Sequence, residues 1–191
     1  MPDKKIIDKI AIVTTNTGKM REFEELLGDY IELEQVKLEC PEIQSESLEE
    51  ISCHSAIFAC KVINMPVIVE DSGLFIHALK GFPGPYSSYV QKTIGNEGIL
   101  KLMEGLKNRK AYFKSVIGFC MPDEEPVSFE GIVKGNISRE IRGEEGFGYD
   151  PIFIPEGYSK TFGEDKELKN RISHRKRAIE NFVAWLEKNN Y

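Results

Sequence analysis

Two adjacent carboxylates follow an apolar run near the middle of this chain. Residues 66–69 are apolar, Glu70 and Asp71 come next, and Ser72 and Gly73 precede a second apolar run. This pattern predicts a buried strand, a tight turn and a second strand. At a strand end, two such carboxylates repel each other by roughly 4 kcal/mol, and a bound cation relieves that repulsion. An ordinary turn, with Gly73 at positive φ and Glu70 facing solvent, is equally compatible with the pattern.

A polar loop follows the first apolar run, residues 10–13. It consists of Thr14, Thr15, Asn16, Thr17, Gly18 and Lys19. Apolar residues then recur at helical spacing, so the loop precedes a helix, whose free N–H groups and dipole favour an anion. The loop is therefore a candidate triphosphate site, although it lacks the Walker A pattern. Taken alone, it favours the simpler alternative of a helix with Asn16 or Thr17 as N-cap and a solvated Lys19.

Two aromatic residues lie in a glycine-rich segment of the second half of the chain. Phe147, Gly148, Tyr149 and Asp150 follow Gly146. Aromatic rings on such a backbone are suited to stacking on a nucleotide base, an interaction worth roughly 1–3 kcal/mol. A loop whose rings fold inward is the alternative.

Basic residues mark the start of the last predicted helix. Ser173 can cap this helix, which places His174 and Arg175 in its first turn. Cations oppose the helix dipole there, so they cost stability unless an anion or an acid compensates them. We therefore favour a binding role for the pair, with a solvated basic turn as the alternative.

Length and composition predict a soluble protein of the cytoplasm. The 191 residues fit a single domain, residues 1–191, made of two lobes. No apolar stretch approaches the ~20 residues of a membrane span, and the N-terminus lacks the apolar core of a signal peptide. A net charge of −6 argues against a nucleic-acid partner. The four cysteines contain no Cys-x-x-Cys pair, which predicts free, mostly buried thiols.

The hydrophobic periodicity predicts an α/β chain. Strands are expected over residues 10–14 and 31–40, and a helix capped by Ser47 should end before Pro66. Two long runs rich in aromatic and β-branched residues, 111–121 and 127–137, predict a hairpin, which we assign to the second lobe.

In their order and spacing, these motifs resemble the inosine/xanthosine triphosphate pyrophosphatase family, in particular its archaeal members. The matching residues are Thr14–Lys19 with Glu22, Glu42, Glu70–Leu74, Gly81–Gly84 with Tyr86 and Ser87, Gly146–Pro151, Lys169 and Ser173–Arg175. The resemblance implies an elongated α/β fold with a central mixed sheet flanked by helices, two lobes with a deep cleft between them, and a homodimer. It also implies hydrolysis of ITP, dITP and XTP to the monophosphate and pyrophosphate with Mg²⁺.

By position, the resemblance also implies roles for single residues. Asp71 becomes the general base and a magnesium ligand, Glu42 a second ligand, and Glu70 a support of the metal cluster. The substrate contacts are Thr14, Thr15, Asn16, Thr17, Gly18, Lys19, Ser72 and Lys169. The base pocket is formed by Phe147, Gly148, Tyr149 and Asp150 with His174 and Arg175.

The sequence departs from the family pattern at a few positions. Thr15 stands where glycine is frequent, Ser55 lies near the position of a helix lysine, and Gly163 and Asp165 replace the usual alanine and methionine. Two other functions stay open: a pyrophosphatase of the same fold acting on pyrimidine or modified triphosphates, and a catalytically silent nucleotide-binding module.

Overall fold

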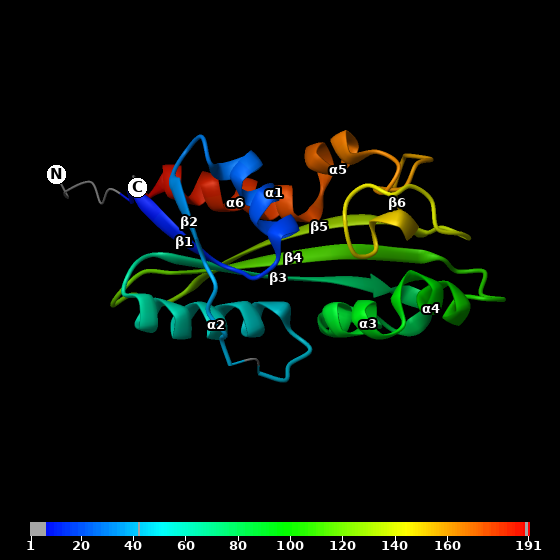
Figure 1. Cartoon of the computed structure of the whole chain (residues 1–191), viewed down its shortest axis with the longest axis horizontal. Coiled ribbons are helices and arrows are strands. Elements are labelled where there is room, and N and C mark those ends of the chain that lie inside the picture. Colours follow the sequence, from blue (N-terminus) through cyan, green and yellow to red (C-terminus); the bar gives the residue numbers. More distant parts are fainter. Residues whose placement is uncertain (1–6, 42, 190) are drawn as a thin grey trace. The chain divides into compact units, whose positions relative to one another are not determined.

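The computed structural model describes residues 7–41, 43–189 and 191. Glu42, a predicted metal ligand, therefore lies outside the described residues. The regular elements confirm the α/β prediction (Figure 1). In chain order they are β1 (Lys9–Val13), α1 (Thr17–Leu27), β2 (Glu32–Val36), α2 (Leu48–Ile63), β3 (Val67–Ile76), η1 (His77–Leu79), η2 (Gly84–Tyr86), α3 (Ser87–Thr93), α4 (Gly95–Leu102), β4 (Lys110–Cys120), β5 (Val127–Ile137), η3 (Asp150–Ile152), β6 (Phe153–Pro155), α5 (Lys166–Ile172) and α6 (His174–Lys188).

The strands form one mixed sheet in the order β2-β1-β3-β4-β5-β6. β1 pairs in parallel with both β2 and β3, and β5 pairs antiparallel with β6. Parallel neighbours need a crossover connection, and α1 and α2 are the helices that connect β1 to β2 and β2 to β3. The mixed sheet implied by the family resemblance is thus confirmed.

The chain divides into two compact units. The first comprises the residues up to Asp71, Ser115–Gly131 and the residues from Arg175 onward, and the second comprises Ser72–Lys114 and Ile132–His174. Strands β3, β4 and β5 each contribute residues to both units. The β4–β5 hairpin, which we expected in the second lobe, is therefore shared between the units.

In the first unit, strand alternation separates two apolar clusters. Ile10, Ile12 and Ile68 pack with residues of α1 and α6, whereas Ala11, Val67 and Val69 pack with residues of α2. Successive side chains of a strand point to opposite faces of the sheet. Accordingly, α1 and α6 cover one face of this unit's sheet and α2 covers the other (Figure 1).

The second unit has a single apolar core. Leu74 and Ile76 of β3 pack there with residues of α3, α4, β4, β5 and α5. The core also includes the ring of Tyr149, which is 4% exposed.

The central acidic stretch does not form the tight turn that we predicted. β3 runs without interruption from Val67 to Ile76, and Gly73 is not among the glycines with positive φ. A glycine at position 73 instead allows the main chain of Gly84 to come close to β3, because a Cβ at this position would collide with the carbonyl of Gly84. The solvent-facing alternative for Glu70 is also wrong, since Glu70 is 6% exposed.

Two of the four cysteines are buried. All four cysteines are described and none forms a disulfide; Cys60 and Cys120 are buried, whereas Cys40 and Cys53 are partly exposed. Burial raises the pKa of the Cys120 thiol to about 12.

Among the described residues, no helix combines the length and apolar character needed to cross a membrane.

Candidate active site

Glu70 is the centre of a buried charged cluster in the first unit. It lies on β3 and its side chain is 2% exposed. Its carboxylate accepts a hydrogen bond from Ser115 Oγ at 2.5 Å and contacts charged groups of Lys19 and Arg175. Because a buried charge is costly unless it is paired and hydrogen-bonded, these partners make burial of the carboxylate tolerable.

Lys19 reaches Glu70 from the first turns of α1. Its Nζ lies 2.8 Å from Glu70 Oε2 and donates to the main-chain carbonyl of Glu70, also at 2.8 Å. Of the two predicted caps, Asn16 and Thr17, Asn16 is the helix N-cap, and its Oδ1 accepts from the Lys19 N–H at 3.0 Å. The solvated lysine of the simpler alternative is wrong, since the Lys19 side chain is only 18% exposed.

The other polar residues of this loop are more accessible. Thr15, Asn16 and Thr17 are exposed, and Thr14 Oγ1 accepts from the N–H of Asn16 at 3.1 Å. Gly18 is partly exposed. The loop thus presents hydroxyl and amide groups to solvent beside a lysine that is already fixed.

Arg175 is the second cation of the cluster. It is 1% exposed, and its Nη2 donates to both carboxylate oxygens of Glu70, at 3.2 and 3.3 Å, while Nη1 donates to Glu22 on α1. The sequence argument called for an anion or an acid to compensate a cation in the first turn of α6, and for Arg175 the acids Glu22 and Glu70 do so. Both acids that Arg175 contacts, Glu22 and Glu70, belong to the first unit.

The cluster of Glu22, Glu70, Lys19 and Arg175 carries no net charge, and its electrostatics follow from burial. Burial alone would raise the pKa of Glu70, but the charges of Arg175 and Lys19 outweigh it and hold this pKa far below its usual range. Burial likewise opposes the charge of Arg175, yet the two carboxylates raise its pKa above the usual value. Both groups therefore stay ionised near neutral pH.

Asp71 is half-buried and directly follows Glu70 on the uninterrupted β3. Since neighbouring side chains of a strand alternate between faces, Asp71 points to the face opposite Glu70. The repulsion that we predicted between the two carboxylates is therefore relieved by strand geometry and by two protein cations. Ser72, the next residue, is also half-buried.

Of the two adjacent acids on β3, only Asp71 has a carboxylate suited to binding magnesium. Among the described residues, no group of three His, Cys, Asp or Glu side chains is arranged to hold a metal ion. Magnesium needs fewer protein ligands than that, because it is usually bound by one or two carboxylates together with substrate phosphates and waters. Asp71 offers one such carboxylate, whereas the oxygens of Glu70 already accept from Lys19, Ser115 and Arg175.

In the second unit, the glycine-rich loop is organised around Asp150. Asp150 is 2% exposed, and its Oδ2 accepts from the N–H of Phe147 at 2.7 Å and from Lys169 Nζ at 2.8 Å. Gly146 has φ +75°, and a Cβ there would collide with the Asp150 carboxylate. A glycine is therefore required where the chain turns around this acid.

The two aromatic rings of the loop behave differently. The Phe147 ring is partly exposed, and Lys169 Nζ lies 4.1 Å from its centroid. The Tyr149 ring is buried and its hydroxyl donates to the carbonyl of Ser87 at 2.8 Å. The inward-folded alternative thus holds for Tyr149, while Phe147 keeps an exposed surface.

Lys169 and His174 are buried in the same unit. Lys169, on α5, is 2% exposed and forms the ion pair with Asp150. The imidazole of His174 is 4% exposed and stacks on Phe113, with centroids 4.6 Å apart and planes inclined by 14°. Lys169 thus contacts the loop that carries Phe147, whereas His174 packs on Phe113, a residue of the second unit's apolar core.

Two amides that the sequence analysis missed also hold this loop. Gln91 Nε2 and Asn96 Nδ2, on α3 and α4, donate to the carbonyl of Gly148 at 3.2 and 3.0 Å. Their side-chain oxygens are buried without a hydrogen-bond partner. Asn96 is the second residue of α4, and neither its type nor its spacing in the sequence indicated a contact 52 residues away.

Known proteins match nearly the whole chain. The Ham1 family is matched over residues 10–185. A protein of Methanopyrus kandleri called dITP/XTP pyrophosphatase is 57% identical over 95% of this chain and 97% of its own length, and one of the same name from Pyrococcus horikoshii is 54% identical over 95% and 98%. The solved structure of the Staphylococcus aureus Ham1 protein has a TM-score of 0.83, with 34% identity over 94% of this chain and 98% of that one.

The chain belongs to the Ham1 family. The family resemblance found in the sequence, including its archaeal members, is thereby confirmed. In this Ham1 protein, two departures from the expected pattern have local reasons. Gly163 leaves no room for a Cβ, which would lie 2.8 Å from Cα of Pro151, and Asp165 caps α5 by accepting from the N–H of Leu168 at 2.9 Å.

The other departures concern possible phosphate contacts in the Ham1 protein. Ser55 is buried on α2, and Lys61 of the same helix is exposed. Thr15 is exposed in the loop before α1. Lys19, the last residue of that loop, is held in place by its contact with Glu70.

Proposed function

We propose that this Ham1 protein hydrolyses non-standard purine nucleoside triphosphates, dITP, ITP and XTP, to the monophosphate and pyrophosphate. The observation that carries the proposal is its similarity, over nearly the whole chain, to proteins called dITP/XTP pyrophosphatase. The substrate would belong to the soluble nucleotide pool of the cytoplasm, and the active form would be a homodimer.

The phosphate chain would be bound by the first unit. An ammonium group has three N–H donors, and the carbonyl and carboxylate of Glu70 accept from the Nζ of Lys19. One donor remains for a phosphate oxygen, and the exposed hydroxyl and amide groups of Thr15, Asn16 and Thr17 lie in the adjacent loop. Glu70 and Arg175 would fix the position of Lys19, so little reorganisation would accompany binding.

Asp71 would act as the general base. It would orient a water molecule and accept its proton while the water oxygen bonds to phosphorus and the P–O–P link between the α- and β-phosphates breaks. Pyrophosphate leaves with the bridging oxygen. Asp71 and Glu42 would be the carboxylate ligands of Mg²⁺, and the bound ion would offset the charge of phosphate and carboxylate oxygens. Glu70, which points to the opposite face of β3, would support this site through its contact with Lys19.

The base would be recognised by the second unit. The exposed face of Phe147 would stack on the purine, while Lys169 occupies a position over the same ring. Gly148, Tyr149, Asp150 and His174 would shape the pocket around it. A donor facing the 6-oxo group would favour inosine and xanthosine over adenosine, because a mismatched buried polar partner is costly.

A panel of triphosphates tests the proposal. Pyrophosphate release would be measured from dITP, ITP, XTP, GTP, dUTP and dTTP, with Mg²⁺ and with EDTA. We expect rapid release from dITP, ITP and XTP that EDTA abolishes. Faster release from dUTP or dTTP would instead assign the protein to pyrimidine or modified triphosphates, and binding of dITP without any release would identify a silent nucleotide-binding module.

A further inference from the structure

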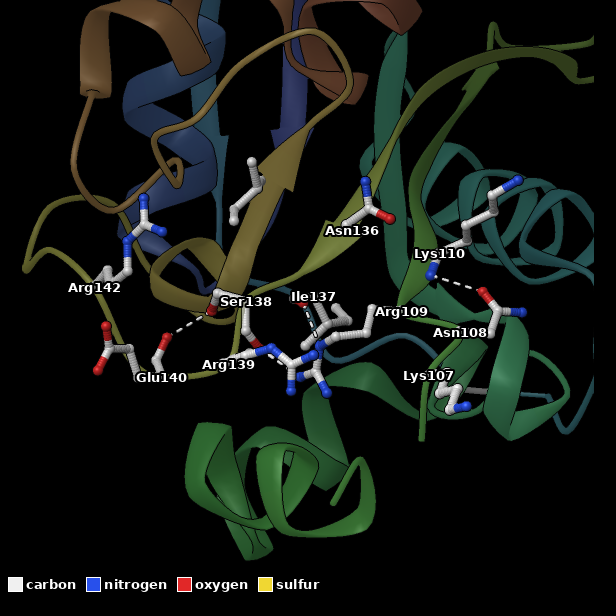
Figure 2. A pocket seen from close by; sticks show the side chains of 11 residues that line it. Lys107, Asn108, Arg109, Lys110, Asn136, Ile137, Ser138, Arg139, Glu140 and Arg142 are labelled. Carbon is white, nitrogen blue, oxygen red and sulfur yellow. Dashed lines mark hydrogen bonds between the residues drawn. The ribbon is translucent and has the colours of Figure 1, made fainter. Parts of the chain in front are cut away.

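A hollow of about 670 Å³ in the second unit has five basic residues and one acid among the eleven residues that line it. Its residues come from the segment that leads into β4, the end of β5, the segment that follows β5, and β6, and they include Arg109 and Arg139 (Figure 2). None of the residues proposed above for substrate, base or metal lines it. We call it the Arg109–Arg139 hollow.

Arg109 is held rigidly in this hollow by main-chain carbonyls. Its Nε donates to the carbonyl of Ile137 at 2.7 Å, Nη1 to that of Met103 at 3.2 Å, and Nη2 to that of Ser138 at 2.5 Å. These carbonyls accept from three of the five N–H donors of the guanidinium, and they bring no negative charge. The group is therefore fixed in place while its charge stays uncompensated.

A second guanidinium lies next to it. Figure 2 shows the side chains of Arg109 and Arg139 side by side in the hollow. Burial lowers the pKa of Arg109, and repulsion by Arg139 lowers it further. Arg139 is exposed, and within the described part of the chain no acid lies in salt-bridge contact with it.

The remaining charges of the hollow do not neutralise this pair. Among the described residues that line it, Glu140 is the only acid, and its charge acts on Arg142. Arg142 is already paired with Glu164 at 2.6 Å. Lys107 adds a further exposed cation. Such an excess of positive charge is unusual on a chain of net charge −6.

We propose that the Arg109–Arg139 hollow binds an oxyanion of the phosphate class. A guanidinium presents paired N–H donors whose geometry matches two oxygens of one phosphate. With Arg109 already fixed, an anion needs to order only Arg139 and Lys107 and it removes the repulsion between the two arginines. The inference rests on the hollow alone and is independent of the proposed hydrolytic activity.

Inorganic phosphate is the probe for this site, measured by calorimetric titration and by amide NMR shifts of the full chain. We expect binding that shifts the amides of residues 107–110 and 136–140. Removing one guanidinium contact in Arg139→Gln should weaken this binding about tenfold. The matched variant Arg171→Gln, an exposed arginine on α5, should bind as the unaltered protein does.

Two further arms separate the alternatives. Lys19→Gln identifies any phosphate that binds at the proposed triphosphate loop, and this variant should leave the shifts at residues 107–110 unchanged. Adenosine monophosphate in place of phosphate tests whether the source is a free anion or a nucleotide phosphate, since contacts beyond the phosphate would make it bind more tightly. Equal phosphate binding by Arg139→Gln and the unaltered protein, or no shift at residues 107–110 and 136–140, would overturn the proposal.

Discussion

Arg175 donates to both carboxylate oxygens of Glu70, although the two residues are 105 positions apart in the chain. The contact joins the start of α6 to the middle of β3 within one compact unit. With Lys19 and Glu22 it forms a buried cluster that has equal numbers of positive and negative groups. We expect the loss of this charge balance to destabilise the first unit.

Removal of the guanidinium should therefore be strongly destabilising. Arg175→Met leaves the carboxylates of Glu22 and Glu70 buried without their main counter-charge. Breaking a buried ion pair on one side costs about 3–5 kcal/mol of unfolding free energy, which urea denaturation followed by circular dichroism would measure. Arg171→Met, the same exchange at an exposed position, should change the value by less than about 0.5 kcal/mol. Equal stability of the two variants would contradict a structural role for the cluster.

The same cluster predicts acid sensitivity. The pKa of Glu70 lies far below its ordinary value of 4.5 in the folded protein, so below that pH the unfolded chain takes up a proton that the folded protein does not. The stabilisation from Glu70 is present above pH 4.5 and is lost progressively as the pH falls. Glu70→Gln should be less stable at pH 7 but lose less further stability on acidification. A variant whose acid profile parallels that of the unaltered protein would exclude Glu70 as a source of this dependence.

Asp71→Asn should remove catalysis while leaving the fold intact. Asparagine is nearly isosteric but cannot accept the proton, and a positioned general base contributes about 100- to 10,000-fold to turnover. The decisive measurements are kcat for dITP, the binding of dITP and the thermal unfolding midpoint. Asp29→Asn, at an exposed position, is the matched control. Turnover near normal in Asp71→Asn would remove Asp71 from the mechanism.

Phe147→Ala should act mainly on the apparent Michaelis constant for dITP. Stacking of one base on an aromatic ring is worth roughly 1–3 kcal/mol, which corresponds to an increase of about 5- to 150-fold. Phe147→Tyr keeps the ring and should restore most of the affinity. If the constant is unchanged in the alanine variant, the ring does not contact the base.

Asn96 should position the loop that carries Phe147. Asn96→Ala leaves only Gln91 to donate to the carbonyl of Gly148, and loss of one such hydrogen bond, about 0.5–1.5 kcal/mol, should raise the Michaelis constant about 2- to 10-fold with little effect on kcat. Glu97→Ala, the exposed neighbour on α4, serves as control. A fall in kcat at constant KM would argue against a role limited to loop position.

Local features of the chain were predictable from the sequence alone. The strand and helix periods, the N-caps Asn16 and Ser47 and the β4–β5 hairpin depend on neighbours within a few residues. The family motifs were recognisable in the same way. A local argument, the unfavourable position of a cation at a helix start, also indicated that an anion or an acid should lie near Arg175, without deciding between the two.

The tertiary structure alone decided which groups meet. It made β3 a continuous strand, turned Glu70 and Asp71 to opposite faces, folded Tyr149 inward and paired Lys169 with Asp150. These outcomes depend on sheet register and on helix packing between residues far apart in the chain. A one-residue change of register would reverse the face on which each carboxylate lies, and nothing in the local pattern of residues 66–76 specifies that register.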